Sequence, residues 1–240
     1  MQVIPYIIPG IPDLEKSLEI IDRIMDYEHI PFVEIGLPAH NPYMDGLVIT
    51  SAQKCLQEKG FGLEEFFSIF SSRYDKNQTK KIVLMGYLSD IEQLGLKEFK
   101  RRIKDLGVSG CIIAGQEEKI LSLVSEWPLP IIPVISSGHD KDFLKVFLEK
   151  RPPFIYFRVS QGKTGEDKLL PASLLSASLG KLKKNWPDIR VFAGFGLKNL
   201  FQIRLMKRIG FDGVIIGSIL VEQMMKNQPI ENFLEELKTV

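Results

Sequence analysis

Eight short apolar segments, each followed by a longer amphipathic segment, alternate along this chain of 240 residues. Each short segment is nearly all apolar, which is typical of parallel strands covered on both faces. The longer segments have helical periodicity; Leu14, Leu18 and Ile21, for example, fall on one stripe of a helix. The predicted strands are Val3–Ile8, Pro31–Gly36, Lys81–Met85, Gly110–Ala114, Ile131–Ile135, Phe154–Val159, Arg190–Ala193 and Gly213–Ile216.

This alternation is compatible with two architectures, a closed barrel and an open doubly wound sheet. An open sheet that binds a dinucleotide would carry a Gly-x-Gly-x-x-Gly turn after its first strand, and this sequence has none there. Eight strands favour an α/β fold of the (β/α)₈ TIM barrel type, for which about 250 residues is the usual size. The sequence contains no linker or low-complexity stretch, so we predict one barrel domain over residues 1–240.

The charges of the chain are nearly balanced, with 31 Lys and Arg against 30 Asp and Glu. Such a chain lacks the positive field that attracts nucleic acid or an anionic membrane, so neither partner is expected. We find no apolar run long enough to span a membrane and no basic region typical of a signal peptide. The two cysteines and three histidines lack metal-ligand spacing, so we expect no metal. These features predict a cytoplasmic protein.

Glu34 lies inside the predicted strand Pro31–Gly36. Because side chains alternate across a strand, Glu34 faces away from Val33 and Ile35, which suit the helix-covered side. Glu34 is then turned into the barrel, near the end where barrel enzymes have their active sites. Poor hydration there raises the pKa of a carboxyl group, so that it can exchange protons near neutrality. The alternative is a structural glutamate paired with a buried Lys or Arg.

Asp45 comes eleven residues later, in the turn-rich loop Asn41–Gly46. An Asp before a Gly is common in ordinary turns, where its side chain bonds to nearby backbone, and that interpretation competes with a functional one. Its place in the loop directly after the strand of Glu34 favours an acid/base pair of Glu34 and Asp45.

Glycine-containing turns follow the seventh and eighth predicted strands. Gly194-Phe195-Gly196 ends the seventh, and Gly217-Ser218 ends the eighth and opens a helix. TIM barrels often hold phosphate in these two loops, where backbone N–H groups and a helix dipole meet the anion. Each glycine could instead only ease a tight turn, but two in consecutive loops predict a phosphate site at Gly196, Gly217 and Ser218.

In combination, these segments resemble the tryptophan synthase alpha chain family from Val3 to about Val221. Val33-Glu34-Ile35-Gly36 is similar to the segment with the catalytic glutamate of that family, and Pro42–Gly46 to the loop with its catalytic aspartate. Further segments are similar to its first strand, its strand-six tyrosine, its lid and its phosphate cradle: Ile4-Pro5-Tyr6, Tyr156, Gly162–Gly165, Gly194–Gly196 and Gly217-Ser218.

The resemblance implies a lyase that cleaves indole-3-glycerol phosphate to indole and glyceraldehyde 3-phosphate. Glu34 would handle the protons at the indole C3 and the glycerol hydroxyl, and Asp45 would take the indole N–H proton. The family also implies a beta-chain partner in a heterotetramer, which carries pyridoxal phosphate, so that this chain needs no cofactor itself. We expect phosphate contacts from Gly165, Gly196, Gly217 and Ser218, and other substrate contacts from Tyr6, Tyr156, Arg158 and Phe195.

The chain departs from the family pattern at several positions, among them the turn Ile8–Pro12, the loop Ala39–Pro42 and Gly115–Glu117. At the position of Arg158 the family has an apolar residue that faces the indole. Strand alternation puts Arg158 on the face of Tyr156, where its charge requires an acid such as Glu34 or a charged ligand. Two alternatives to the family reaction therefore stay open: an altered or inactive barrel that acts as a binding or activating subunit, and a lyase for a related phosphorylated substrate.

Overall fold

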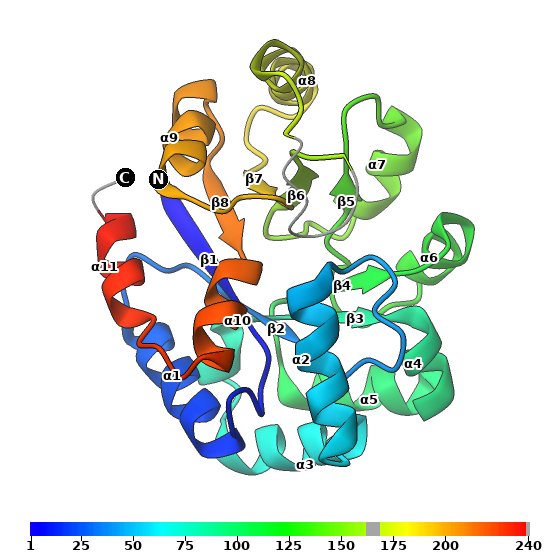
Figure 1. The fold of residues 1–240 in the computed structure, drawn as a ribbon. Coiled ribbons are helices and arrows are strands. Elements are labelled where there is room, and N and C mark those ends of the chain that lie inside the picture. Colours follow the sequence, from blue (N-terminus) through cyan, green and yellow to red (C-terminus); the bar gives the residue numbers. More distant parts are fainter. Residues whose placement is uncertain (162–168, 239–240) are drawn as a thin grey trace.

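The computed structural model describes residues 1–161 and 169–238. Eight parallel strands form one sheet in the order β4-β3-β2-β1-β8-β7-β6-β5, so strands that follow one another in the chain are neighbours (Figure 1). The strands are β1 (Gln2–Ile7), β2 (Val33–Gly36), β3 (Ile82–Tyr87), β4 (Gly110–Ala114), β5 (Val134–Ile135), β6 (Ile155–Arg158), β7 (Val191–Gly194) and β8 (Gly213–Ile216).

The two ends of this sheet meet at the residues just before β5. Cys111 of β4 forms a parallel bridge with Ile131. The Cys111 N–H group donates to the carbonyl of Pro130 at 3.0 Å, and the Ile132 N–H group donates to the carbonyl of Cys111 at 2.8 Å. This bridge closes the sheet and confirms the predicted (β/α)₈ TIM barrel.

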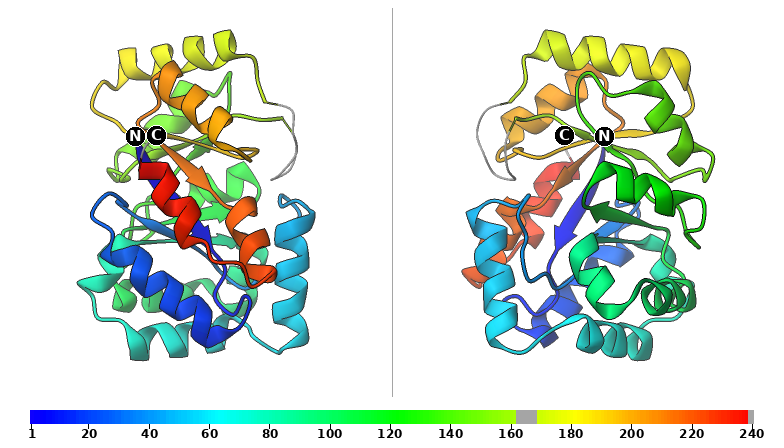
Figure 2. Two further views of the ribbon diagram at one scale, coloured as in Figure 1. Left: turned by 60° about the vertical axis from the view of Figure 1, so that its left-hand side comes forward. Right: turned by 90° about the vertical axis from the view of Figure 1, so that its right-hand side faces the viewer.

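The helices surround the barrel and cover the outer faces of its strands (Figures 1 and 2). The first helix begins after Asp13, whose side chain accepts a hydrogen bond from the Lys16 N–H group at 2.9 Å. The elements are α1 (Leu14–Asp26), α2 (Leu47–Glu58), α3 (Leu63–Arg73), η1 (Gln78–Lys81), α4 (Leu88–Leu94), α5 (Leu96–Leu106), α6 (Glu117–Val124), α7 (Lys141–Leu148), α8 (Ala172–Asn185), α9 (Leu200–Ile209), α10 (Ser218–Met225) and α11 (Glu231–Lys238).

The predicted fifth strand, Ile131–Ile135, is shortened to β5, Val134–Ile135. Pro133 interrupts it because proline has no N–H group to donate to a neighbouring strand. The segment between α3 and β3 ends in the short helix η1. Among the described helices none combines the length and the apolar character needed to cross a membrane.

Candidate active site

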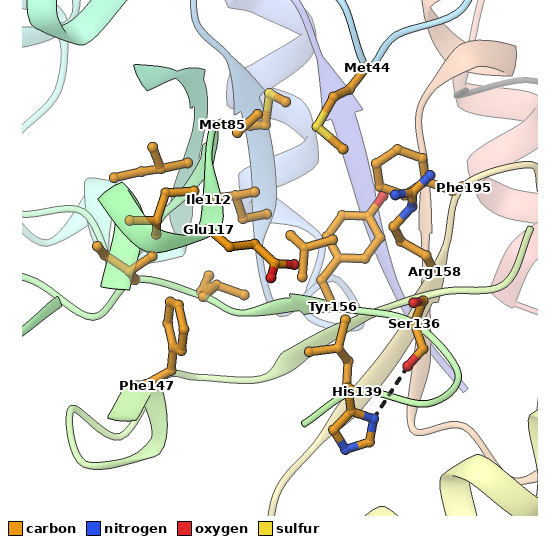
Figure 3. Close-up of a pocket in the computed structure, with 18 of the residues that line it drawn as sticks. Met44, Met85, Ile112, Glu117, Ser136, His139, Phe147, Tyr156, Arg158 and Phe195 are labelled. Atoms are coloured by element: carbon orange, nitrogen blue, oxygen red, sulfur yellow. Dashed lines mark hydrogen bonds between the residues drawn. The ribbon is translucent and has the colours of Figure 1, made fainter. Parts of the chain in front are cut away.

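A cavity of about 760 Å³ lies at the carboxyl ends of the strands and extends between the loops that follow them (Figure 3). Every predicted site residue that the structure describes lies on its wall. The predicted lid and Gly165 fall within 162–168, outside the described residues. The predicted residues on the wall are Tyr6, Glu34, Asp45, Tyr156, Arg158, Phe195, Gly196, Gly217 and Ser218.

Glu34 lies in β2 beside Tyr6 of β1 and is only 3% exposed. Burial, and next the charge of Asp45, raises the pKa of Glu34 to about 8. Within the described part of the chain, Oε2 of Glu34 has no hydrogen-bond partner and no Lys or Arg forms an ion pair with Glu34. The structural alternative therefore lacks the buried cation that it requires, and Glu34 is protonated at neutral pH.

Asp45 turns its side chain into the barrel from the loop between β2 and α2. The hydroxyl of Tyr87, at the end of β3, donates a hydrogen bond of 2.7 Å to Oδ2 of Asp45. The backbone N–H group of Asp45 also closes a turn with the carbonyl of Pro42 at 3.0 Å. Asp45 thus belongs to a turn, as its sequence context indicated, but its carboxylate is buried and reaches a neighbouring strand.

Gln53 of α2 holds the start of this loop. Its Oε1 accepts a hydrogen bond of 3.0 Å from the Ala39 N–H group, and its Nε2 donates one of 3.0 Å to the carbonyl of Leu37. Gln57, one turn later, donates to the carbonyl of Ala39 at 2.7 Å. The segment Ala39–Pro42, which departs from the family pattern, is therefore anchored to α2.

Sequence reasoning missed both Tyr87 and Gln53. The predicted third strand ended at Met85, whereas β3 continues to Tyr87. Strand alternation over those two further residues would have put Tyr87 on the same face as Met85, which lies on the cavity wall. Gln53 carried no such signal, because a single polar residue on an amphipathic helix is common.

Two tyrosines fill the interior beside Glu34, and glycines on neighbouring strands leave room for them. A Cβ atom at Gly36 would lie 2.2 Å from the hydroxyl of Tyr6, and one at Gly194 would lie 2.2 Å from Cε2 of Tyr156. Burial, together with the charges of Asp45 and Glu34, raises the pKa of both tyrosines. Both therefore stay protonated and can donate hydrogen bonds to a ligand.

The predicted phosphate loops lie side by side after β7 and β8. Phe195 and Gly196 have positive φ angles of 65° and 89°, which turn the chain sharply after β7. Gly217 precedes the first residue of α10, Ser218, and its carbonyl accepts the first helical hydrogen bond from Val221 at 3.0 Å. The N–H groups of the first turn thus have no acceptor within the helix and are suited to an anion.

Arg158, at the end of β6, lies on the cavity wall beside Tyr156, as alternation predicted. Its guanidinium carbon is 4.7 Å from the centroid of the Phe195 ring (Figure 3), a cation–π contact, and Glu34 is not its ion-pair partner. His40 lies in the loop after β2 but off the cavity wall, and its Nδ1 is 2.7 Å from Oδ1 of the buried Asp90.

Comparison with known proteins agrees with this geometry. The family model described as tryptophan synthase alpha chain matches residues 1–240. The tryptophan synthase alpha chain of Dictyoglomus thermophilum is 30% identical, over 98% of this chain and 91% of that protein. The alpha chain of Carboxydothermus hydrogenoformans is 32% identical, over 99% of this chain and 88% of that protein. The solved tryptophan synthase subunit alpha from Campylobacter jejuni superimposes with a TM-score of 0.76 at 25% identity, over 96% of this chain and 91% of that one. This chain therefore belongs to the tryptophan synthase alpha chain family.

Proposed function

We propose that this chain cleaves indole-3-glycerol phosphate to indole and glyceraldehyde 3-phosphate, with Glu34 and Asp45 as the acid/base pair. Membership of the family supports the reaction. The observation that carries the assignment of residues is the burial of Glu34 in a cavity that it shares with Asp45, with a pKa raised to about 8. A carboxyl group that is protonated at neutral pH has a proton to give, and a general acid needs one.

Glu34 acts first as an acid and then as a base. It transfers its proton to the indole C3, and the N–H proton of the resulting indolenine cation passes to Asp45. The Glu34 carboxylate then takes the proton of the hydroxyl on the carbon bonded to C3. Those O–H electrons form the aldehyde C=O bond, the C–C bond breaks, and its electron pair returns to the indole ring. Asp45 returns its proton to the ring nitrogen, so both carboxyl groups regain their starting states.

Tyr87 supports the role of Asp45. Its hydroxyl donates to Oδ2 of Asp45 at 2.7 Å, which stabilises the carboxylate form and fixes its direction. The glycine turns at Gly196 and Gly217, with Ser218, bind the phosphate through N–H and hydroxyl groups. Because the phosphate does not react, its binding energy serves to orient the indole end of the substrate against Glu34.

Replacement of either carboxylate tests the assignment. We expect Glu34→Gln and Asp45→Asn each to lower kcat for indole release by roughly 10²- to 10⁴-fold, the usual contribution of a general acid or base. Glu117→Gln is the matched control, since Glu117 lies on the same cavity wall but is exposed to solvent. The measurement is indole release from indole-3-glycerol phosphate by the purified chain, with and without a tryptophan synthase beta chain.

Unchanged indole release by Glu34→Gln or Asp45→Asn would contradict the residue roles. No indole from the wild-type chain under either condition would contradict the reaction itself. If the chain then still activated a beta chain, it would act as an activating subunit rather than as a lyase.

We further propose that a tryptophan synthase beta chain is the partner, in a heterotetramer, and that pyridoxal phosphate belongs to that chain alone. Family membership supports this assignment, and the product supports it too, because indole is an apolar molecule that a partner enzyme can consume. Light scattering of an equimolar mixture with a beta chain tests it: two species of the separate masses would contradict the proposal.

A further inference from the structure

Arg158 is the only Lys or Arg on the described part of the cavity wall. Six carboxyl groups share that wall with it, and one of them, that of Glu34, is protonated at neutral pH. An anionic substrate that enters this cavity therefore meets several carboxylates, and on the described part of the wall Arg158 is the Lys or Arg side chain that can compensate for its charge. The six carboxyl groups are those of Glu34, Asp45, Glu117, Glu118, Asp140 and Asp142.

The position of Arg158 puts its charge next to the glycine turn after β7. Arg158 pairs with Gly194 in the parallel ladder of β6 and β7, and the N–H group of Val159 donates to the carbonyl of Gly194 at 2.9 Å. Gly194 leads directly into Phe195 and Gly196. The strand that ends in Arg158 is thus fixed to the strand that carries the turn.

The ring of Phe195 forms a cation–π contact with the guanidinium of Arg158. With its φ angle of 65°, Phe195 turns its ring under Arg158, and the ring centroid is 4.7 Å from the guanidinium carbon (Figure 3). A guanidinium held over an aromatic ring by a cation–π contact can still direct N–H groups of its fork to two oxygens of one phosphate. The contact also restricts the side chain, so that little freedom is lost when a ligand binds.

We propose that Arg158 is a phosphate ligand of the substrate and works with the N–H groups of the turns at Gly196 and Gly217. This proposal rests on the proposed function, because it assumes that the substrate bound in this cavity is phosphorylated. Arg158 adds a cationic side chain to a phosphate-binding site that otherwise consists of backbone N–H groups and a hydroxyl group. The phosphate oxygens then lie between the end of β6 and the start of α10.

Glycerol 3-phosphate tests this proposal, because it carries the phosphate without the reacting indole. We expect Arg158→Met to raise the Kd for glycerol 3-phosphate, measured by calorimetry on the full chain, about 10- to 100-fold. Arg158→Lys keeps the charge and loses the fork, so its Kd should lie between those of wild type and Arg158→Met. In the indole-release assay, Arg158→Met should raise KM, because the phosphate contact is already made in the ground state.

Arg190→Met is the matched control. Arg190 also lies over a phenylalanine ring, that of Phe32 at 5.6 Å, but it precedes β7 and lies off the cavity wall. This variant should bind glycerol 3-phosphate as the wild type does.

The outcomes separate this proposal from the proposed function. If the wild type releases indole and Arg158→Met binds glycerol 3-phosphate as tightly as the wild type, the role of Arg158 is wrong and the lyase stands. If Arg158→Met weakens that binding and the wild type releases no indole, the phosphate ligand stands and the lyase is wrong. Equal loss of binding in Arg158→Met and Arg190→Met would also overturn the proposal, since the effect would then be general rather than local.

Discussion

At the scale of single residues, the environment of Glu34 gives the protein a measurable pH dependence. Its pKa is about 8 in the folded chain because burial disfavours the charged form, whereas in the unfolded chain it returns to its ordinary value near 4.5. The folded state therefore binds the proton more tightly than the unfolded state. By linkage, Glu34 contributes least stability above pH 8, where the folded chain must bury a charged carboxylate.

We expect the free energy of unfolding of the wild type to fall as the pH rises from about 4.5 to 8, by at most about 5 kcal/mol from this group. Glu34→Gln, which cannot ionise, should lack this part of the pH dependence and should be the more stable protein at pH 9. Urea unfolding of both proteins at pH 5, 7 and 9 is the measurement. Parallel pH profiles for the two would show that Glu34 has an ordinary pKa in the folded chain.

At the scale of elements, the loop between β2 and α2 depends on α2 for its shape. Gln53 satisfies two buried backbone groups, the Ala39 N–H and the Leu37 carbonyl, and this loop also carries Asp45. A leucine at position 53 would fill the space but bond to neither group. The structure therefore connects a residue far from the reacting atoms to the position of a proposed catalytic carboxylate.

We expect Gln53→Leu to lower the free energy of unfolding by roughly 2–5 kcal/mol, because two buried groups lose their partners. Misplacement of Asp45 should lower kcat for indole release by roughly tenfold or more. Gln57→Leu is the control: Gln57 bonds to the same loop from an exposed position, so its loss should cost less in both measurements. A destabilised Gln53→Leu protein with wild-type kcat would show that Asp45 does not depend on this anchor.

At the scale of the whole molecule, the barrel is least well paired where it closes. Neighbouring strands such as β2 and β3 pair over four residues, Val33 to Gly36 against Ile82 to Met85. Between β4 and the residues before β5, the described contacts are the bridge Cys111–Ile131 and two backbone hydrogen bonds. Pro130 and Pro133 flank this bridge and contribute no N–H groups.

We expect the closure between β4 and β5 to open before the rest of the barrel. In hydrogen exchange at native conditions, the Ile132 amide should exchange about tenfold faster or more than the buried amides of β3, which corresponds to an opening free energy at least about 1.4 kcal/mol lower. The β3 amides serve as the internal reference. Equal protection would mean that the closure opens only when the whole barrel unfolds. We propose that residues 1–240 form a single barrel domain.

Much of the architecture follows from the sequence alone, because it depends on local patterns. Strand and helix periodicity predicted the eight strands and the barrel, and alternation within β2 turned Glu34 inward. The glycine turns after the seventh and eighth strands were visible for the same reason, since they depend on neighbouring residues only. Even the placement of Arg158 beside Tyr156 followed from a two-residue spacing.

Only the tertiary structure decided how these local pieces interact across the barrel. Tyr87 reaches Asp45 from 42 positions away in the sequence, and Gln53 anchors Ala39 from another element. The partner of Arg158 could not be read from its strand either: alternation gave its face, but the turn at Phe195 supplied the ring beneath it. The raised pKa of Glu34 likewise results from burial by all the surrounding strands. Such properties depend on distances between segments remote in the chain, and folding of the whole barrel alone sets those distances.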